Sequence, residues 1–141
     1  AIRQRTLKHY VRRNTLREDV ASMRQKMRRQ LDKSDSQTFD LKQGEGGIGD
    51  IEFIVQYLVL KHAGQYPSTI HYSENIRQLD ALAEAGAIAA DQALLLQDVY
   101  RCYRRELHHR TLDGADNLVS QASFVDERRS VGDIWRSVFG D

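Results

Sequence analysis

The chain has 141 residues, 40% hydrophobic and 29% charged, a composition that is typical of one folded domain and excludes a disordered protein. It has neither an apolar run long enough to cross a membrane nor a signal-peptide pattern, and its single cysteine, Cys102, excludes an internal disulfide, so we expect a cytoplasmic protein with no membrane partner. The net charge of +1 hides an asymmetry, because residues 1–33 contain eleven Lys and Arg against three Asp and Glu, whereas residues 34–141 contain ten against seventeen.

The basic N-terminal segment is predicted to form two helices. The first spans about residues 2–13, and the second begins at Thr15, where Glu18 completes a capping box. Apolar residues at spacings of three and four predict the face of the second helix that packs into the core: Leu16, Val20, Met23, Met27 and Leu31. Off that stripe lie three arginines: Arg17, Arg24 and Arg28.

The second helix also allows two functional interpretations. Its two methionines could form an adaptable binding face, although a place in the core is the commoner role for such a stripe. Its arginines could bind the phosphates of a nucleic acid, but an amphipathic basic helix more often docks on an acidic surface of its own chain or of a neighbour. We therefore favour a packed helix and keep nucleic-acid binding as the alternative.

The middle of the chain is predicted to supply the central element of the fold. A polar linker over 34–38 leads to a short extended segment near residues 39–43. A helix follows from about Ile48 to Ala63, and because it is apolar on nearly every side, we expect it to lie in the middle of a bundle. Gly64 is predicted to end this helix, with Pro67 in the loop that follows.

Three further helices complete the prediction. One is capped by Ser73 and stopped by Gly86, the next spans about residues 90–110, and the last begins at Ser123 or Asp126. The inward residues of the middle one are expected to be Leu95, Leu96, Val99, Cys102, Tyr103 and Leu107. The fold class is therefore all-α, a bundle of five or six helices with at most one short extended segment near residues 39–43, in a single helical domain over 1–141.

The most specific local feature is a glycine-rich turn before the central helix. Gly44, Gly46 and Gly49 match the G-x-G-x-x-G pattern of dinucleotide-binding turns. We reject that function, because no parallel strand is predicted after the helix and no βαβ unit can form. Two possibilities remain: free backbone amides beside Lys42 could contact a phosphate held by another domain, or the glycines could permit a sharp turn and close packing, with Asp50 at the helix N-terminus.

Two carboxylates follow the turn. Asp50 and Glu52 point about 200° apart on a helix, so they cannot jointly chelate one ion. Glu52 shares a face with Gln56 on a very apolar helix and is predicted to be buried. A buried carboxylate needs partners, so Glu52 is expected to brace the glycine turn by accepting backbone N–H groups, or to pair with an arginine.

No catalytic apparatus is recognisable from composition and spacing. His108 and His109 are adjacent and face different ways, so a metal site there is not expected. Cys102 has no neighbouring base and is interpreted as a small buried residue rather than a nucleophile. No Walker-type G-K-[ST], Ser-His-Asp or zinc-ligand pattern is present in the sequence.

Residues 39–60 nevertheless resemble a known family. The run over residues 39–53 reads Phe-Asp-Leu-Lys-Gln-Gly-Glu-Gly-Gly-Ile-Gly-Asp-Ile-Glu-Phe and is similar to bacterial glutamine synthetase adenylyltransferase. Two further runs agree: Asp-Val-Ala-Ser-Met-Arg-Gln-Lys-Met-Arg over residues 19–28, and Glu-Leu-His-His over 106–109. The resemblance covers nearly the whole chain.

The resemblance implies a function for the parent protein. The family is a bifunctional enzyme in which one half attaches AMP to a tyrosine of glutamine synthetase and the other removes it, under control of PII signal protein and glutamine. Each half contains a nucleotidyltransferase domain followed by a helical domain. This chain is similar to the helical domain at the C-terminus, so the resemblance implies the nucleotidyltransferase domain of the same chain and glutamine synthetase as partners, and no nucleic acid.

One departure from the family bears on the site. The catalytic domain of the family carries a G-S-x-x-D-L-D motif that binds Mg²⁺ and ATP phosphates, and this sequence lacks it. We therefore expect a C-terminal fragment of a larger enzyme that is inactive alone and binds no cofactor itself. The candidate domain-junction or phosphate-proximal residues are Lys42, Gln43, Gly44, Gly46, Gly47, Asp50 and Glu52. The rival hypothesis is a free-standing interaction module whose basic helix binds nucleic acid.

Overall fold

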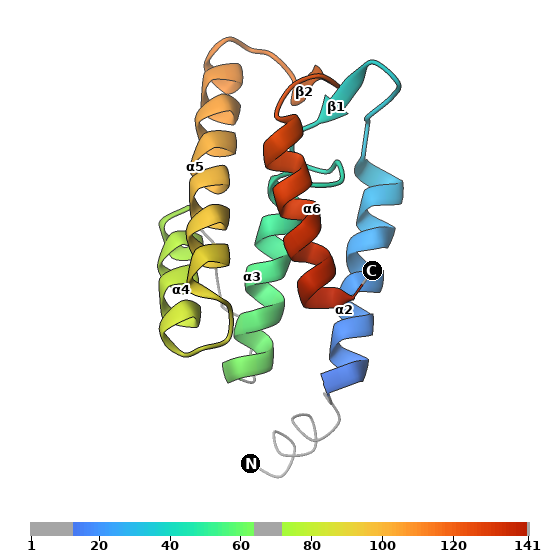
Figure 1. The fold of residues 1–141 in the computed structure, drawn as a ribbon. Helices are drawn as coiled ribbons and strands as arrows, with labels where there is room; N and C mark the ends of the chain where they lie inside the picture. Colours follow the sequence, from blue (N-terminus) through green and yellow to red (C-terminus); the bar gives the residue numbers. More distant parts are fainter. Residues whose placement is uncertain (1–12, 64–71, 141) are drawn as a thin grey trace.

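The structure is a computed structural model, and it describes residues 13–63 and 72–140. Within these ranges the element order is α2 (Arg13–Leu31), β1 (Thr38–Asp40), α3 (Ile48–Ala63), α4 (Tyr72–Glu84), α5 (Ala90–Leu112), β2 (Leu118–Ser120) and α6 (Val125–Phe139), as Figure 1 shows. The predicted all-α class is therefore confirmed. Three predictions lie wholly or almost wholly outside the described residues: the helix over 2–13, the stop at Gly64 and the loop at Pro67. Two predicted helix starts are wrong, because Thr15 lies within α2, which already includes Arg13, and Ser73 lies within α4, which already includes Tyr72.

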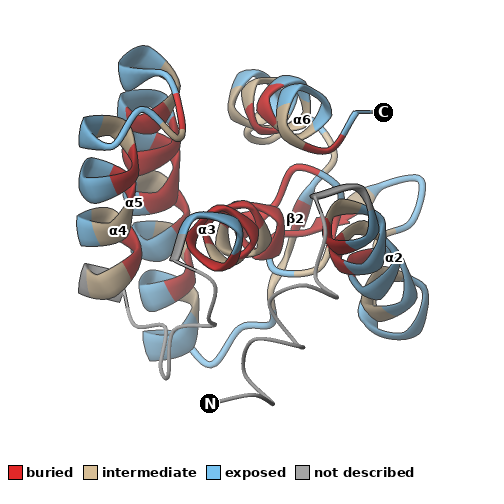
Figure 2. Ribbon diagram, turned by 90° about the horizontal axis from the view of Figure 1, so that it is seen from below, coloured by how far each residue is buried: buried red, intermediate tan, exposed pale blue. Residues whose placement is uncertain are grey.

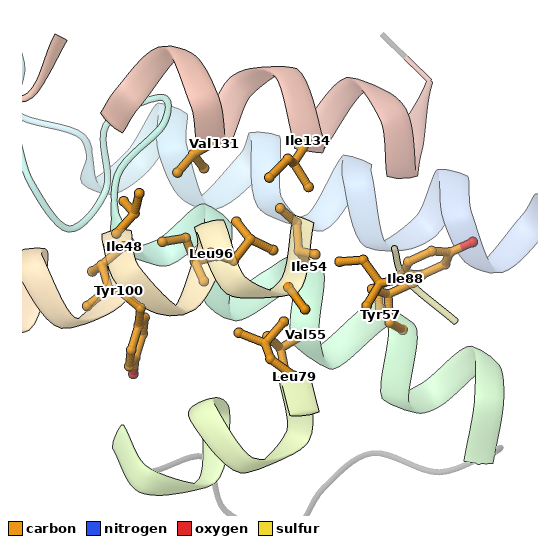
Figure 3. Close-up of a cluster of buried hydrophobic side chains, with 14 of the residues drawn as sticks. Ile48, Ile54, Val55, Tyr57, Leu79, Ile88, Leu96, Tyr100, Val131 and Ile134 are labelled. Atoms are coloured by element: carbon orange, nitrogen blue, oxygen red, sulfur yellow. The ribbon is translucent and has the colours of Figure 1, made fainter. Parts of the chain in front are cut away.

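Helix α3 lies at the centre of the bundle, as its apolar composition predicts. It contacts α2, α4, α5 and α6, and Figure 2 shows it between α2 on one side and the α4–α5 pair on the other. Its side chains Ile51 and Ile54 are fully buried. Figure 3 shows Ile54 and Val55 pointing toward Leu79, Leu96 and other apolar side chains of the surrounding helices. Each such burial contributes roughly 1.5–3 kcal/mol to folding, so this core is the main source of stability.

A two-stranded antiparallel sheet closes one end of the bundle. Its register pairs Thr38 with Ser120, Phe39 with Val119, and Asp40 with Leu118. The extended segment expected near residues 39–43 is thus present, but it is shorter and is followed at once by the glycine turn. Strand β2 was not predicted, because three residues are too few to show an alternating pattern.

The predicted apolar stripe of α2 is only half correct. Leu16 and Val20 are buried, but Met23 is 52% exposed and Leu31 is 46% exposed. Arg24, which was placed off the stripe, is completely buried instead. The physical reason is local: beyond Val20 the neighbouring surface of α3 presents the buried carboxylate of Asp50 beside the Phe53 ring, and a guanidinium can contact both.

Helix α5 follows its predicted face with one clear exception. Leu96, Val99, Tyr103 and Leu107 are buried and Cys102 is half-buried, as an inward face requires. Leu95 was expected to be inward but is 39% exposed. It lies next to the buried Leu96, so on a helix its side chain is turned by about 100° away from that residue.

Candidate functional site

The glycine turn between β1 and α3 is held by close contacts that admit no side chain. Gly46 adopts φ +85°, a left-handed conformation that favours glycine, and a Cβ added there would lie 2.6 Å from the carbonyl oxygen of Arg128. A Cβ on Gly44 would lie 2.4 Å from the ring of Phe39, and one on Gly47 would lie 2.5 Å from the Leu41 carbonyl oxygen. The glycines therefore serve a sharp turn and close packing.

Backbone amides of the turn donate to acceptors within the chain. The Gly44 amide donates to the Asp40 carbonyl at 2.8 Å, and the Gly46 amide donates to Asp50 Oδ2 at 2.8 Å. The amides of Gly47, Ile48, Gly49 and Asp50 donate to carbonyls of the same segment, which belong to Gly44, Leu41, Lys42 and Gly47 respectively. Because these donors are engaged, they are not available to a phosphate in this conformation, and the packing interpretation of the glycines describes the geometry better.

Asp50 is the residue that braces the turn. Its side chain is 2% exposed and accepts hydrogen bonds from Arg24 Nε at 2.7 Å and Arg28 Nη2 at 2.6 Å, in addition to the Gly46 amide. Arg24 also donates to the side-chain and backbone oxygens of Gln43, at 2.8 and 3.1 Å. We call Arg24, Arg28 and Asp50 the arginine clamp. It ties α2 to the start of α3 and fixes the turn between them.

Glu52 does not brace the glycine turn, which was the first of its two predicted roles. Its hydrogen bond is with the Tyr100 hydroxyl of α5, at 3.5 Å, and not with an amide of the glycine turn. Burial raises the pKa of Glu52, although the charges of Lys42, Arg104 and Arg24 act in the opposite direction. Burial, together with the nearby Glu52 charge, raises the pKa of Tyr100 to about 12. The bracing role expected of Glu52 thus belongs to Asp50, and Glu52 instead contacts α5.

Lys42 and Gln43 lie at the edge of the turn, where Lys42 is exposed and Gln43 is half-buried. The buried Asp40 fixes their backbone, because its Oδ1 accepts hydrogen bonds from both of their amides at 3.0 Å. Both residues line a surface hollow of about 380 Å³, whose other lining residues include Leu31, Lys33 and Leu118. The structure therefore places five of the seven predicted site residues in the turn and bonds Asp50, in the first turn of α3, to it. Glu52 lies on a different side of α3 and contacts α5.

Sequence reasoning missed four residues that hold this turn. Arg24 and Arg28 are four apart and share a face, which is the signal that could have revealed them as partners of a lone acid on an apolar helix. Tyr103 donates from its hydroxyl to the Gly46 carbonyl at 2.8 Å, and Arg128 lies over the Phe39 ring at 3.9 Å from its centroid. These last two come from distant elements, and no local pattern indicates them.

The described part of the chain offers little for metal chemistry. Over 13–63 and 72–140 no group of three or more His, Cys, Asp or Glu side chains is placed to hold a metal ion. His108 and His109 are exposed, and their ring centroids are 6.4 Å apart. Burial raises the pKa of the Cys102 thiol, which makes it less nucleophilic. No helix in these ranges is long and apolar enough to cross a membrane.

Comparison with protein families identifies the relatives of this fold. A model of the family described as GlnD PII-uridylyltransferase matches residues 14–125, which include the arginine clamp and the whole glycine turn. The chain belongs to this family. The match ends where α6 begins, so Arg128, which packs against Gly46, lies beyond it.

Individual proteins similar to this chain have a different name from the family model. The chain is 45% identical over 126 residues to the bifunctional glutamine synthetase adenylyltransferase/adenylyl-removing enzyme of Nitrosococcus oceani, which covers 89% of this chain and 13% of that protein. It is 43% identical over 124 residues to the enzyme of that name from Mannheimia succiniciproducens, and 40% over 137 residues to that from Thioalkalivibrio sulfidiphilus. The predicted resemblance is confirmed. The chain spans only 13–14% of the length of these relatives.

Proposed function

We propose that this chain is a helical domain that supports the transfer of AMP from ATP to a tyrosine of glutamine synthetase, by packing on a nucleotidyltransferase domain of the same longer protein. The observation that carries the proposal is the 39–45% identity, over most of the chain, to proteins named glutamine synthetase adenylyltransferase/adenylyl-removing enzyme. ATP and Mg²⁺ would be bound by the other domain, because the amides of residues 42–44 and 46–50 donate within the chain and its described residues provide no metal-binding cluster.

The arginine clamp gives this domain a defined edge. Arg24, Arg28 and Asp50 fix the turn, and the turn presents Lys42 to solvent, with the half-buried Gln43 beside it at the hollow. A rigid edge of this kind suits a domain junction, since ordering it on contact costs little conformational entropy. In this proposal the edge faces the catalytic domain, and glutamine synthetase and the regulators PII and glutamine act on the assembled cytoplasmic enzyme.

The test compares AMP transfer by three proteins: the chain alone, the longer protein, and the longer protein without residues 1–141. Incorporation of AMP into glutamine synthetase is followed by mass spectrometry. We expect transfer by the longer protein only, since the catalytic carboxylates and the supporting domain are both needed. Transfer by the chain alone, or an undiminished rate after its removal, would contradict the proposal.

A charge reversal tests the position of the junction. Lys42→Glu should lower the rate of transfer about tenfold, the effect of losing one favourable charge contact of about 1.4 kcal/mol. Lys61→Glu is the matched control, because Lys61 is also exposed but lies at the other end of α3. Equal rates of AMP transfer for the two variants would show that Lys42 does not lie at the junction.

A further inference from the structure

Helix α2 exposes an apolar face that its own fold does not use. We call Met23, Met27 and Leu31 the methionine face. Met23 is 52% exposed, Leu31 is 46% exposed, and Met27 between them is partly buried. The spacing of four places the three side chains along one side of the helix over about 12 Å. These residues follow the pattern of a core-facing stripe, yet two of the three are largely in solvent.

The arginine clamp explains why this face is left over. The N-terminal half of α2 packs on the core through Leu16 and Val20, but the next inward position is occupied by the buried guanidinium of Arg24. Arg28, one turn later, also turns to Asp50. Charged contacts therefore replace apolar packing along this half of the helix. The methionine face remains beside the clamp, where the described helices do not cover it.

Exposed lysines border the methionine face. Leu31 continues it into the hollow of about 380 Å³, which is lined by Lys33 and Lys42, by the buried Asp40 and by Asp116. Both lysines are exposed, as is Lys26 on the flank of α2. A partner that buries the methionine face must therefore present an apolar centre with carboxylates at its rim. Methionine suits such a contact, because its flexible thioether adapts to the opposing surface.

We infer that the methionine face, with Lys33 and Lys42 at its edge, is covered by another part of the longer protein, through an apolar patch with an acidic rim. This rests on the proposed function, in which the chain is one domain of a nucleotidyltransferase. Two observations favour this occupant: the chain spans only 13–14% of the relatives' length, and the face runs into the turn that carries Lys42. A second copy fits less well, because a two-fold contact would bring these lysines together.

Methionine oxidation measures this contact directly, because Met23 and Met27 are the only methionines of the chain. The longer protein carrying Leu94→Met is treated with hydrogen peroxide, and sulfoxide formation is followed by mass spectrometry. Leu94 is 60% exposed and belongs to α5. Helix α5 lies on the other side of α3 from α2 (Figure 2), so the introduced methionine is an internal reference. We expect Met23 to be oxidised about tenfold more slowly than the reference, because oxidation follows exposure.

The result that would overturn the inference is equal oxidation of Met23 and the reference. Protection that develops only after glutamine synthetase is added would also overturn it, since the occupant would then be a separate protein. Protection that falls on dilution would assign the face to a second copy and would contradict the inference as well. None of these readouts depends on AMP transfer, so their outcome is independent of the activity test.

A pair of double variants provides the second arm. Met23→Glu with Met27→Glu should loosen the domain from the rest of the longer protein, seen as faster limited proteolysis between them, by about tenfold. Leu94→Glu with Leu112→Glu is the matched control, because both leucines are more exposed than Met23 and lie on α5. Equal cleavage rates for the two double variants would contradict the inference.

Discussion

Asp50 is a buried charge that is fully partnered. Removing a carboxylate from water costs several kcal/mol, and the guanidinium groups of Arg24 and Arg28 offset this cost together with the Gly46 amide. The Arg24 side chain is itself 0% exposed. If either Arg24 or Asp50 were removed, water could not take its place as a hydrogen-bond partner. The clamp therefore depends on all its members being present.

Asp50→Asn should lower the free energy of unfolding by about 3–5 kcal/mol, because it leaves the buried charge of Arg24 without its counter-ion. Urea unfolding of the parent and the variant measures the change. Asp126→Asn is the control, since the carboxylate of Asp126 is 93% exposed and its contact with Arg129 is long, at 4.0 Å. The control should leave the midpoint nearly unchanged, and similar shifts in the two variants would show that the clamp adds no stability.

The raised pKa of Glu52 predicts that the stability of the protein depends on pH. Burial raises the pKa of Glu52 above its ordinary value of 4.5, so the folded protein retains a proton that the unfolded chain loses. Stability from this group is present below pH 4.5 and is lost as the pH rises through the folded pKa. Glu52→Gln has no proton to lose, so its advantage over the parent should grow as the pH rises from 4.5 toward neutrality. Urea unfolding at several pH values tests this, and a difference that stays constant would contradict it.

At the scale of elements, Gly46 joins the turn to three other parts of the fold. Its amide donates to Asp50 of α3, its carbonyl accepts from Tyr103 of α5, and its Cα lies against the backbone of Arg128 in α6. No Cβ can be placed there without moving α6. The turn therefore sets the position of α6 as well as the start of α3.

Gly46→Ala should destabilise the protein more than Gly86→Ala does. Both glycines have positive φ, +85° and +77°, so alanine costs about 1–2 kcal/mol at either position. Only Gly46 adds overpacking, of about 1–3 kcal/mol, because nothing lies within 4 Å of a Cβ at Gly86. Thermal unfolding of both variants measures the difference in stability. Equal losses of stability would contradict the overpacking at Gly46, since α6 would then move away from the added Cβ without cost.

The elements differ in how far the sequence predicts them. Helix α3 was predicted well, because a helix that is apolar on every side is stable only where other helices surround it. The stripe of α2 failed beyond Val20, because periodicity cannot show that an acid on another helix will select Arg24 over Met23. The same limit applies to the site: the glycine turn is visible as a local pattern, whereas the contacts of Tyr103 and Arg128 with it depend on the tertiary fold.

At the scale of the whole molecule, the clamp removes part of the charge that suggested nucleic-acid binding. Arg24 and Arg28 belong to the basic N-terminal segment, but both are paired with Asp50. The net charge of the chain is only +1. The basic helix is therefore used within the fold, which favours docking over phosphate binding.

We expect no saturable binding of duplex or single-stranded DNA below about 100 μM protein at physiological salt, which is the weak limit of non-specific binding. Fluorescence anisotropy with labelled oligonucleotides, repeated at low and high salt, measures this. Tight binding that falls steeply with salt would restore the nucleic-acid alternative. Weak binding that is unchanged by Lys26→Glu would show that α2 plays no part in it.

The contacts of the glycine turn also bear on the order of folding. The Tyr103–Gly46 hydrogen bond joins positions 57 residues apart, and the Gln121–Thr38 bond joins positions 83 apart, whereas α4 and α5 are joined by a short turn. Long closures cost more chain entropy, so the α4–α5 pair should form early and the glycine turn late. Substitutions in the turn should then accelerate unfolding and leave the refolding rate almost unchanged. The turn would thus control how long the folded domain persists rather than how quickly it forms.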